Sequence, residues 1–85
     1  MISIPIPRLV IVSPCYNEEA ILAYSARELT TLLERLIAAG KILPTSHVLY
    51  VNDGSRDRTW ELIEELHREN HFIDGLCLAG NVGHQ

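Results

Sequence analysis

One stretch of the sequence, "LYVNDGSRDRTWELIEEL" at residues 49–66, constrains the fold more than any other. Its Asp53-Gly54 pair follows an apolar run, and such a pair is a strong signal for a hairpin turn. A hairpin would need a second strand, but the apolar residues after Ser55 recur at helical spacing, at Trp60, Ile63 and Leu66. The chain is therefore expected to pass from strand to helix through one short polar loop.

The sequence before this stretch shows the same change, from a short strand-like apolar run to apolar residues at helical spacing. Leu9–Ser13 is a short apolar run that favours a strand buried on both faces. From Glu18 to about Ala39 the apolar residues follow three- and four-residue steps, which predicts a helix. Asn17 is its expected N-cap, and Gly40 stands where a helix C-terminus favours a residue with positive φ.

The rest of the chain supplies two more strands and a second helix. After a proline-containing loop, His47–Val51 is the second expected strand. The second helix is expected from about residue 57 to 70, with Ser55 or Asp57 as its N-cap. Residues 72–78 are the third expected strand. The predicted order is β-α-β-α-β.

This order predicts an α/β fold, a Rossmann-like parallel sheet in a single domain over residues 1–85, with residues 1–8 as an extended lead-in. Connections of this length join parallel strands and are right-handed in nearly all proteins. The carboxyl ends of the strands then share one edge, where ligands bind in open parallel sheets. Three polar segments follow those ends: "SPCYNEE", "NDGSRD" and "AGNVGHQ".

Composition and charge exclude several classes of protein. With 47% hydrophobic and 21% charged residues, the chain is neither disordered nor fibrous. A net charge of −4, with seven Lys and Arg residues scattered along the chain, argues against nucleic acid as a partner. The N-terminal segment has neither the positive start of a signal peptide nor the length of a membrane span, so we expect a cytoplasmic protein.

The two cysteines, Cys15 and Cys77, are expected near the ends of the first and third strands. An intervening strand would separate them by roughly 9 to 10 Å, which is twice the strand spacing of about 4.8 Å. A disulfide tolerates at most about 7 Å between Cα atoms. Two free thiols are therefore predicted.

The first polar segment lacks the glycines of a phosphate-binding loop. The sequence contains neither G-x-G-x-x-G after the first strand nor G-x-x-x-x-G-K-[ST], and Pro14 to Glu18 includes no glycine. The first loop offers the ring of Tyr16, and the second offers the carboxylate of Asp53. A nucleobase could stack on Tyr16 while Asp53 accepts hydrogen bonds from the base or the ribose, with Gly54 letting backbone amides approach.

Three segments in order, "VIVSPCYNEEAIL", "VLYVNDGSRDRTWELIEEL" and "LAGNVGHQ", resemble the beginning of the family 2 glycosyltransferases of the GT-A fold. The branch that they resemble moves a sugar from a nucleotide donor onto a polyprenyl or dolichyl phosphate. The resemblance covers nearly the whole chain from Leu9. It implies the N-terminal nucleotide-binding half of a GT-A fold and a UDP- or GDP-sugar as the partner.

The resemblance also implies a nucleotide-binding role for eight residues. Pro14 and Tyr16 would line the base pocket, with Glu18 at its rim. Asp53 would bond the base, while Gly54 and Ser55 shape the loop. Two further residues fall in the segment that leads into the donor site in relatives, so the full set is Pro14, Tyr16, Glu18, Asp53, Gly54, Ser55, Asn81 and Gly83. Asn52 stands where many relatives have Asp.

In this family the residues that carry catalysis are expected after Gln85. They include the D-x-D-type carboxylates that hold Mg²⁺ or Mn²⁺ on the donor diphosphate, the catalytic base and the acceptor site. We therefore expect this chain to be the N-terminal part of a longer enzyme, with no catalytic residue, no metal ligand and no turnover alone. A lipid-phosphate acceptor would place that enzyme at the cytoplasmic face of a membrane, in cell-wall or glycolipid synthesis.

Structural roles and other functions stay open beside these assignments. Tyr16 could be a packed loop aromatic, Asp53 a turn former, Glu18 a partner of the helix dipole and Cys15 an apolar filler. A doubly wound signalling module is a second candidate, although it would favour an acidic cluster after the first strand. A third is a non-catalytic module that forms oligomers through an uncovered sheet edge.

Overall fold

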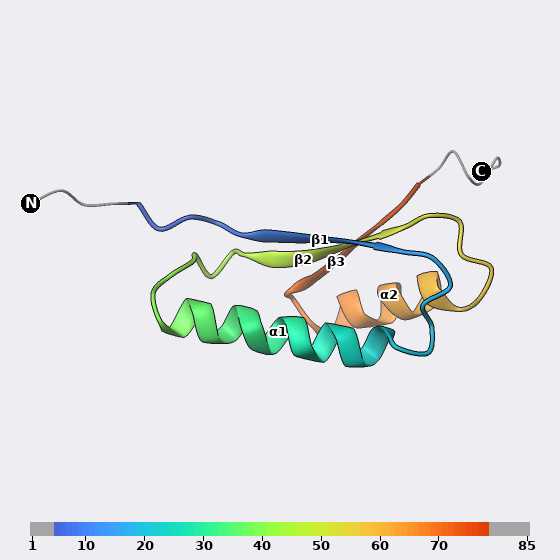
Figure 1. The fold of residues 1–85 in the computed structure, drawn as a ribbon, viewed down its shortest axis with the longest axis horizontal. Helices are drawn as coiled ribbons and strands as arrows, with labels where there is room; N and C mark the ends of the chain where they lie inside the picture. Colours follow the sequence, from blue (N-terminus) through green and yellow to red (C-terminus); the bar gives the residue numbers. More distant parts are fainter. Residues whose placement is uncertain (1–4, 79–85) are drawn as a thin grey trace, which may run out of the picture.

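A computed structural model describes residues 5–78 of the chain, in which three strands alternate with two helices (Figure 1). The elements are β1 (Val10–Cys15), α1 (Leu22–Ala38), β2 (His47–Asn52), α2 (Thr59–Glu69) and β3 (Ile73–Cys77). The predicted α/β class and element order are confirmed. Strand β1 extends beyond its predicted end to include Pro14, which a strand at the edge of a sheet tolerates.

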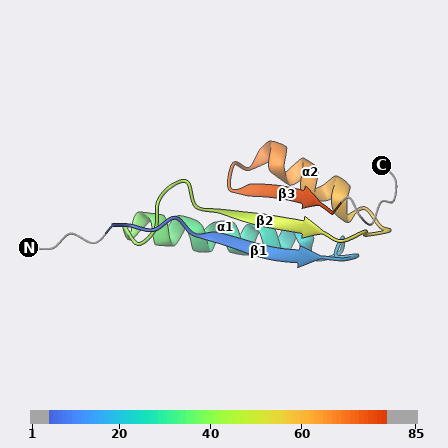
Figure 2. The same ribbon diagram turned by 90° about the horizontal axis from the view of Figure 1, so that it is seen from above.

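The three strands form one parallel sheet in the order β1-β2-β3, and in Figure 2 all three arrows point the same way. At the carboxyl ends of the strands, Asn52 of β2 is the register partner of Cys15 in β1 and of Cys77 in β3. The two cysteines are thus separated by a strand and are both free thiols, as predicted.

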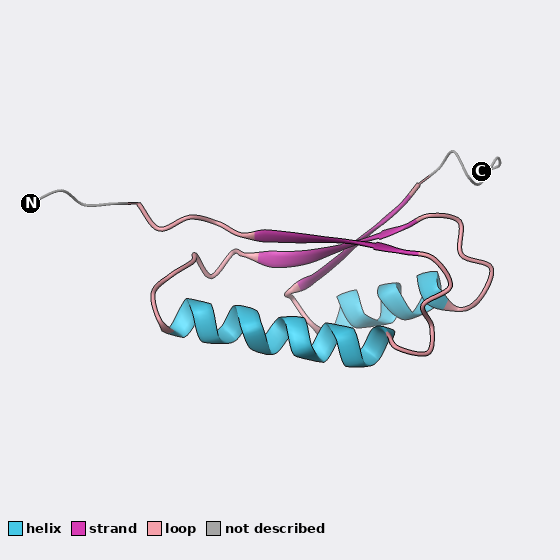
Figure 3. Ribbon diagram, viewed as in Figure 1, coloured by secondary structure: helices cyan, strands magenta, loops and turns pink. Residues whose placement is uncertain are grey.

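Both helices lie on the same side of the sheet (Figures 1 and 3). This is expected when two successive crossovers between parallel strands have the same hand. The largest fully buried side chains come from the helices and from the sheet face that they cover, and include Leu22, Leu33, Tyr50, Ile63 and Ile73. The core of the described residues is therefore a single layer between two helices and one sheet face.

The expectation that the first strand is buried on both faces is wrong for the described residues. Burial alternates along β1, where Ile11 is half-buried and Val12 is 59% exposed. The physical reason is the placement of both helices on one side, which leaves the other face of the sheet open. Val10, Val12 and Leu76 consequently expose apolar side chains there.

The end of the first helix is predicted correctly and the starts of both helices are not. Gly40 has φ +72°, and the N–H groups of Gly40 and Lys41 donate to carbonyls in the last turn, which is a Schellman motif. At the other end, α1 starts after Ile21 and α2 after Arg58, neither of which caps with its side chain. Asn17 and Ser55 are therefore not N-caps.

Gly75 allows α2 to pack closely on β3. A Cβ atom at this position would overlap Cγ2 of Ile63 and would lie 3.2 Å from Cζ3 of Trp60, which is also closer than a normal contact. This close approach explains the glycine that interrupts the apolar sequence of β3. Trp60 itself is partly buried and packs against the core.

Gly75→Ala should lower the free energy of unfolding by about 1–3 kcal/mol, because the added methyl overpacks this contact. Urea denaturation would measure the loss. The loss should shrink in an Ile63→Ala background, which lacks the Cγ2 atom. Gly40→Ala is the matched control, because it is strained only by its φ and its Cβ would meet nothing within 4 Å. An identical cost of Gly75→Ala in both backgrounds would contradict this explanation.

Candidate functional site

Tyr16 and Asp53 occupy adjacent positions at the carboxyl ends of the strands. Each directly follows the last residue of its strand, and those last residues, Cys15 and Asn52, are register partners. The backbone N–H of Asp53 donates to the carbonyl of Cys15 at 3.0 Å. The convergence expected from the parallel topology is thus confirmed. Tyr16 is 53% exposed and Asp53 is also exposed, so solvent reaches both side chains.

The loops that carry these residues are hydrogen-bonded to each other. We call residues 16–21 the first loop and residues 53–58 the second loop. The N–H of Asn17 donates to Oγ of Ser55 at 2.9 Å, and Oδ1 of Asn17 accepts the N–H of Arg56 at 2.8 Å. Asn17 makes both contacts with φ +53°, a left-handed conformation that asparagine tolerates better than most residues.

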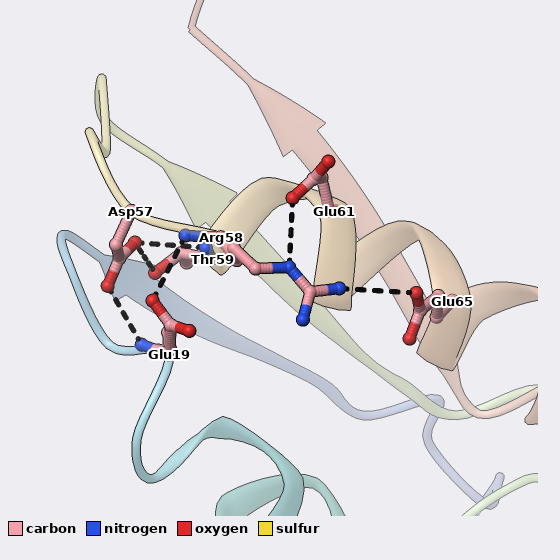
Figure 4. A network of polar contacts seen from close by, with 6 residues as sticks. All are labelled: Glu19, Asp57, Arg58, Thr59, Glu61 and Glu65. Carbon is pink, nitrogen blue, oxygen red and sulfur yellow. Dashed lines mark hydrogen bonds and ion pairs between the residues drawn. The ribbon is translucent and has the colours of Figure 1, made fainter.

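A second reciprocal pair lies beside the first (Figure 4). The N–H of Glu19 donates to Oδ2 of Asp57 and the N–H of Arg58 donates to Oε1 of Glu19, both at 3.2 Å. Between these pairs, the N–H of Glu18 donates to Oγ1 of Thr59 at 2.8 Å. Thr59 is the first residue of α2 and is fully buried, so the first loop is also fastened to the start of this helix.

Three consecutive backbone N–H groups of the first loop, at residues 17, 18 and 19, therefore donate to side chains of residues 55, 59 and 57. Successive backbone amides of this kind can bind anions when they are free. In this chain all three N–H groups already donate to side chains of the second loop or of α2. These three amides therefore hold the two loops together.

Asp57 accepts hydrogen bonds both from the first loop, at Glu19, and from the start of α2, at Thr59. Its Oδ1 accepts the N–H of Thr59 at 2.9 Å and also the hydroxyl of Thr59. The hydroxyl is the main cause that holds the pKa of Asp57 below its ordinary value, and the backbone N–H groups of Thr59 and Glu19 act in the same direction. The network therefore favours an ionised Asp57.

Two other predicted site residues, Pro14 and Glu18, line a cavity that is separate from Tyr16 and Asp53. Pro14 and Glu18 border a shallow cavity of about 130 Å³ between β1 and the start of α1, and Tyr16 and Asp53 lie outside its lining. Cys15 also borders it. Burial, with a smaller contribution from the Glu18 carboxylate, raises the pKa of the Cys15 thiol. A buried, protonated thiol fits the apolar filler role expected of Cys15.

The remaining predicted residues divide between the second loop and the C-terminal segment. Gly54 and Ser55 are half-buried in the second loop, and Gly54 has φ +73°. Asn81 and Gly83 lie outside the described residues. Arg58 pairs with Glu61 at 3.1 Å and with Glu65 at 3.6 Å on the exposed side of α2 (Figure 4).

Sequence reasoning missed the contacts between the loops and one buried polar residue. Asn17 and Ser55 were expected to cap helices and instead join segments about 40 residues apart. Asp57 does both, because it accepts the N–H of Thr59 at the start of α2 and the N–H of Glu19 in the first loop. Asn52 is 3% exposed and its Nδ2 donates to Sγ of Cys77 at 3.4 Å, while its Oδ1 has no partner among the described residues. A buried amide therefore lies at the strand ends beneath the two loops.

Within residues 5–78, no group of three or more His, Cys, Asp or Glu side chains is arranged to hold a metal ion. Neither α1 nor α2 is long and apolar enough to cross a membrane.

Comparison with known proteins gives two matches. The sequence profile of the family described as "Glycosyl transferase family 2" matches residues 10–85. The chain is also 46% identical over 79 residues to a Bacillus subtilis (strain 168) protein named "Uncharacterized glycosyltransferase YkoT". That alignment covers 93% of this chain and 23% of the relative, so the chain spans about a quarter of the relative's length. No solved structure matches the chain significantly.

The depressed pKa of Asp57 predicts a pH-dependent difference between wild type and Asp57→Asn. The stabilisation from ionised Asp57 should be present above its ordinary pKa of 3.8 and should disappear as the pH falls through the lower folded-state value. Denaturant unfolding of both proteins from pH 6 downward would measure it. Thr59→Val removes the hydroxyl and should reduce the difference. A difference that does not change with pH would contradict this role for Asp57.

Proposed function

The chain belongs to glycosyl transferase family 2, and from this membership we propose that its two joined loops bind the nucleotide of a nucleotide-sugar donor. One observation carries the proposal. An exposed aromatic ring and an exposed carboxylate follow paired residues at the carboxyl ends of β1 and β2, where open parallel sheets bind ligands. The ring and the carboxylate supply the two contacts that a nucleoside needs.

Tyr16 and Asp53 would divide recognition between stacking and hydrogen bonding. The face of a nucleobase stacks on an aromatic side chain, an interaction worth about 1–3 kcal/mol per base. The carboxylate of Asp53 accepts hydrogen bonds from the imide or amide N–H of the base, or from ribose hydroxyls. Uracil and guanine both present such N–H groups, so the proposal covers both UDP- and GDP-sugars.

The other predicted residues have supporting roles in this proposal. Pro14, the second-last residue of β1, is proposed to line the base pocket, and Glu18 is proposed to lie at its rim; both residues border the cavity next to β1. Gly54 and Ser55 shape the second loop, where the Ser55 hydroxyl already accepts the N–H of Asn17. Asn81 and Gly83 are proposed to approach the nucleoside from the segment after β3.

Chemistry at the sugar is proposed to need residues beyond the described part of the chain. The family resemblance implies Mg²⁺ or Mn²⁺ on the donor diphosphate, and residues 5–78 contain no group of side chains suited to hold it. We propose that the intact enzyme transfers the sugar to a polyprenyl phosphate and that residues 1–85 alone do not turn over.

The exposed edges and the open face of the sheet support a second candidate function, which is association with another protein chain. The outer edge of β1 has no neighbouring strand among the described residues, and Val12 and Leu76 expose apolar side chains on the open face. Unpaired edges and exposed apolar patches favour association. Light scattering would distinguish a monomer from an oligomer formed in this way.

Titration of the intact protein with UDP and with GDP tests the proposed nucleotide site. Tyr16→Ala should weaken binding of the preferred nucleotide about 5- to 150-fold, and Asp53→Ala about 10- to 100-fold, because each loses one of the two contacts. Tyr24→Ala and Glu34→Ala are matched controls, since both side chains are exposed on α1 and neither residue belongs to the two loops. One dissociation constant shared by wild type and all four variants would rule out the site.

A further inference from the structure

We infer that Asn17 and Ser55 are positioning residues that hold Tyr16 and Asp53 in their binding arrangement before the nucleotide arrives. Their two hydrogen bonds, from Asn17 N–H to Ser55 Oγ and from Arg56 N–H to Asn17 Oδ1, are called the clasp. The inference rests on the proposed function, because it concerns how the same two loops meet a nucleotide. In this role Asn17 affects nucleotide binding without contacting the nucleotide itself.

The position of the clasp in the chain supports this role. Asn17 directly follows Tyr16, and Ser55 comes two residues after Asp53. Each hydrogen bond crosses from one loop to the other, between residues 38 and 39 positions apart. The clasp therefore fixes the two ligand-facing positions relative to each other at the points where the chain leaves β1 and β2.

The conformation of Asn17 restricts which residue can do this. Its backbone has φ +53°, which lies in the left-handed region. Most residues other than glycine rarely adopt this conformation, but Asn and Asp tolerate it better than the others. The position also needs a short side chain with an acceptor oxygen for the N–H of Arg56. Asn and Asp meet both requirements, whereas Gly keeps the backbone conformation and loses the acceptor.

The clasp is a separate contact from the packing that holds the fold together. Asn17 is exposed and Ser55 is half-buried, so neither side chain fills the core. Two other contacts of the first loop, from Glu18 N–H to the buried Thr59 and from Glu19 N–H to Asp57, do not involve the clasp and should persist when it is removed. Loss of the clasp should consequently free the segment next to Tyr16 while leaving the sheet and helices in place.

Freeing this segment should weaken nucleotide binding without removing any contact to the ligand. A ligand that touches both loops must then order them when it binds, and that ordering subtracts from the affinity. Loss of one or two hydrogen bonds of ordinary strength corresponds to a decrease in affinity of about 3- to 30-fold. The same loss should have little effect once the ring that the clasp positions is absent.

The test is calorimetric titration of the intact protein with UDP or GDP, whichever wild type binds more tightly. Asn17→Gly and Ser55→Ala should each raise the dissociation constant about 3- to 30-fold. Ser55→Thr keeps the acceptor oxygen without adding a charge and should bind within about twofold of wild type, which is a small free-energy difference. Thermal unfolding of each variant verifies that it folds, and if Asn17→Gly does not fold, the Ser55 pair decides.

A double-mutant cycle separates positioning from a general structural effect. Asn17→Gly should cost much less affinity in a Tyr16→Ala background than in wild type, because no ring remains to be positioned. Equal costs in the two backgrounds would overturn the inference. So would wild-type affinity in both Asn17→Gly and Ser55→Ala while Tyr16→Ala and Asp53→Ala still weaken binding. If those last two variants also bind normally, the proposed function itself fails.

Discussion

The pairing of Cys15 with Asn52 at the carboxyl ends of β1 and β2 is the contact on which the rest of the site depends. Because the strands are parallel and in this register, the residues that follow them, Tyr16 and Asp53, leave the sheet side by side. The hydrogen bond from Asp53 N–H to the Cys15 carbonyl carries the ladder one step beyond the strands. A slip of one residue would turn the side chains of a strand to the opposite face and separate these two positions.

The loops beyond this pairing are joined by side chains that accept backbone N–H groups. Three consecutive backbone N–H groups of the first loop donate to side chains of Ser55, Asp57 and Thr59. In the other direction, backbone N–H groups of the second loop donate to the side chains of Asn17 and Glu19. Backbone donors are thus used to hold the loops together, while an exposed ring and a carboxylate face solvent. This arrangement is the basis of the nucleoside site proposed for this family 2 glycosyltransferase domain.

The fold was predictable from periodicity because the apolar stripes of both helices and the short runs of the strands are strong local signals. The meeting of Tyr16 and Asp53 followed from parallel topology alone. Asn17 and Ser55 were misassigned as caps because short polar side chains before a helix look the same whether they bond locally or to a distant loop. The open sheet face was missed because a short apolar run cannot reveal whether one or two of its faces are covered. The segment with Asn81 and Gly83 lies outside the described residues.

A crystal structure of the intact protein with a bound nucleoside diphosphate would test the central claim most directly. The account predicts a nucleoside at the carboxyl ends of β1 and β2, with its base against the ring of Tyr16 and within hydrogen-bonding distance of the Asp53 carboxylate. A nucleoside bound at the opposite end of the sheet, near the start of β2 and β3, would contradict it.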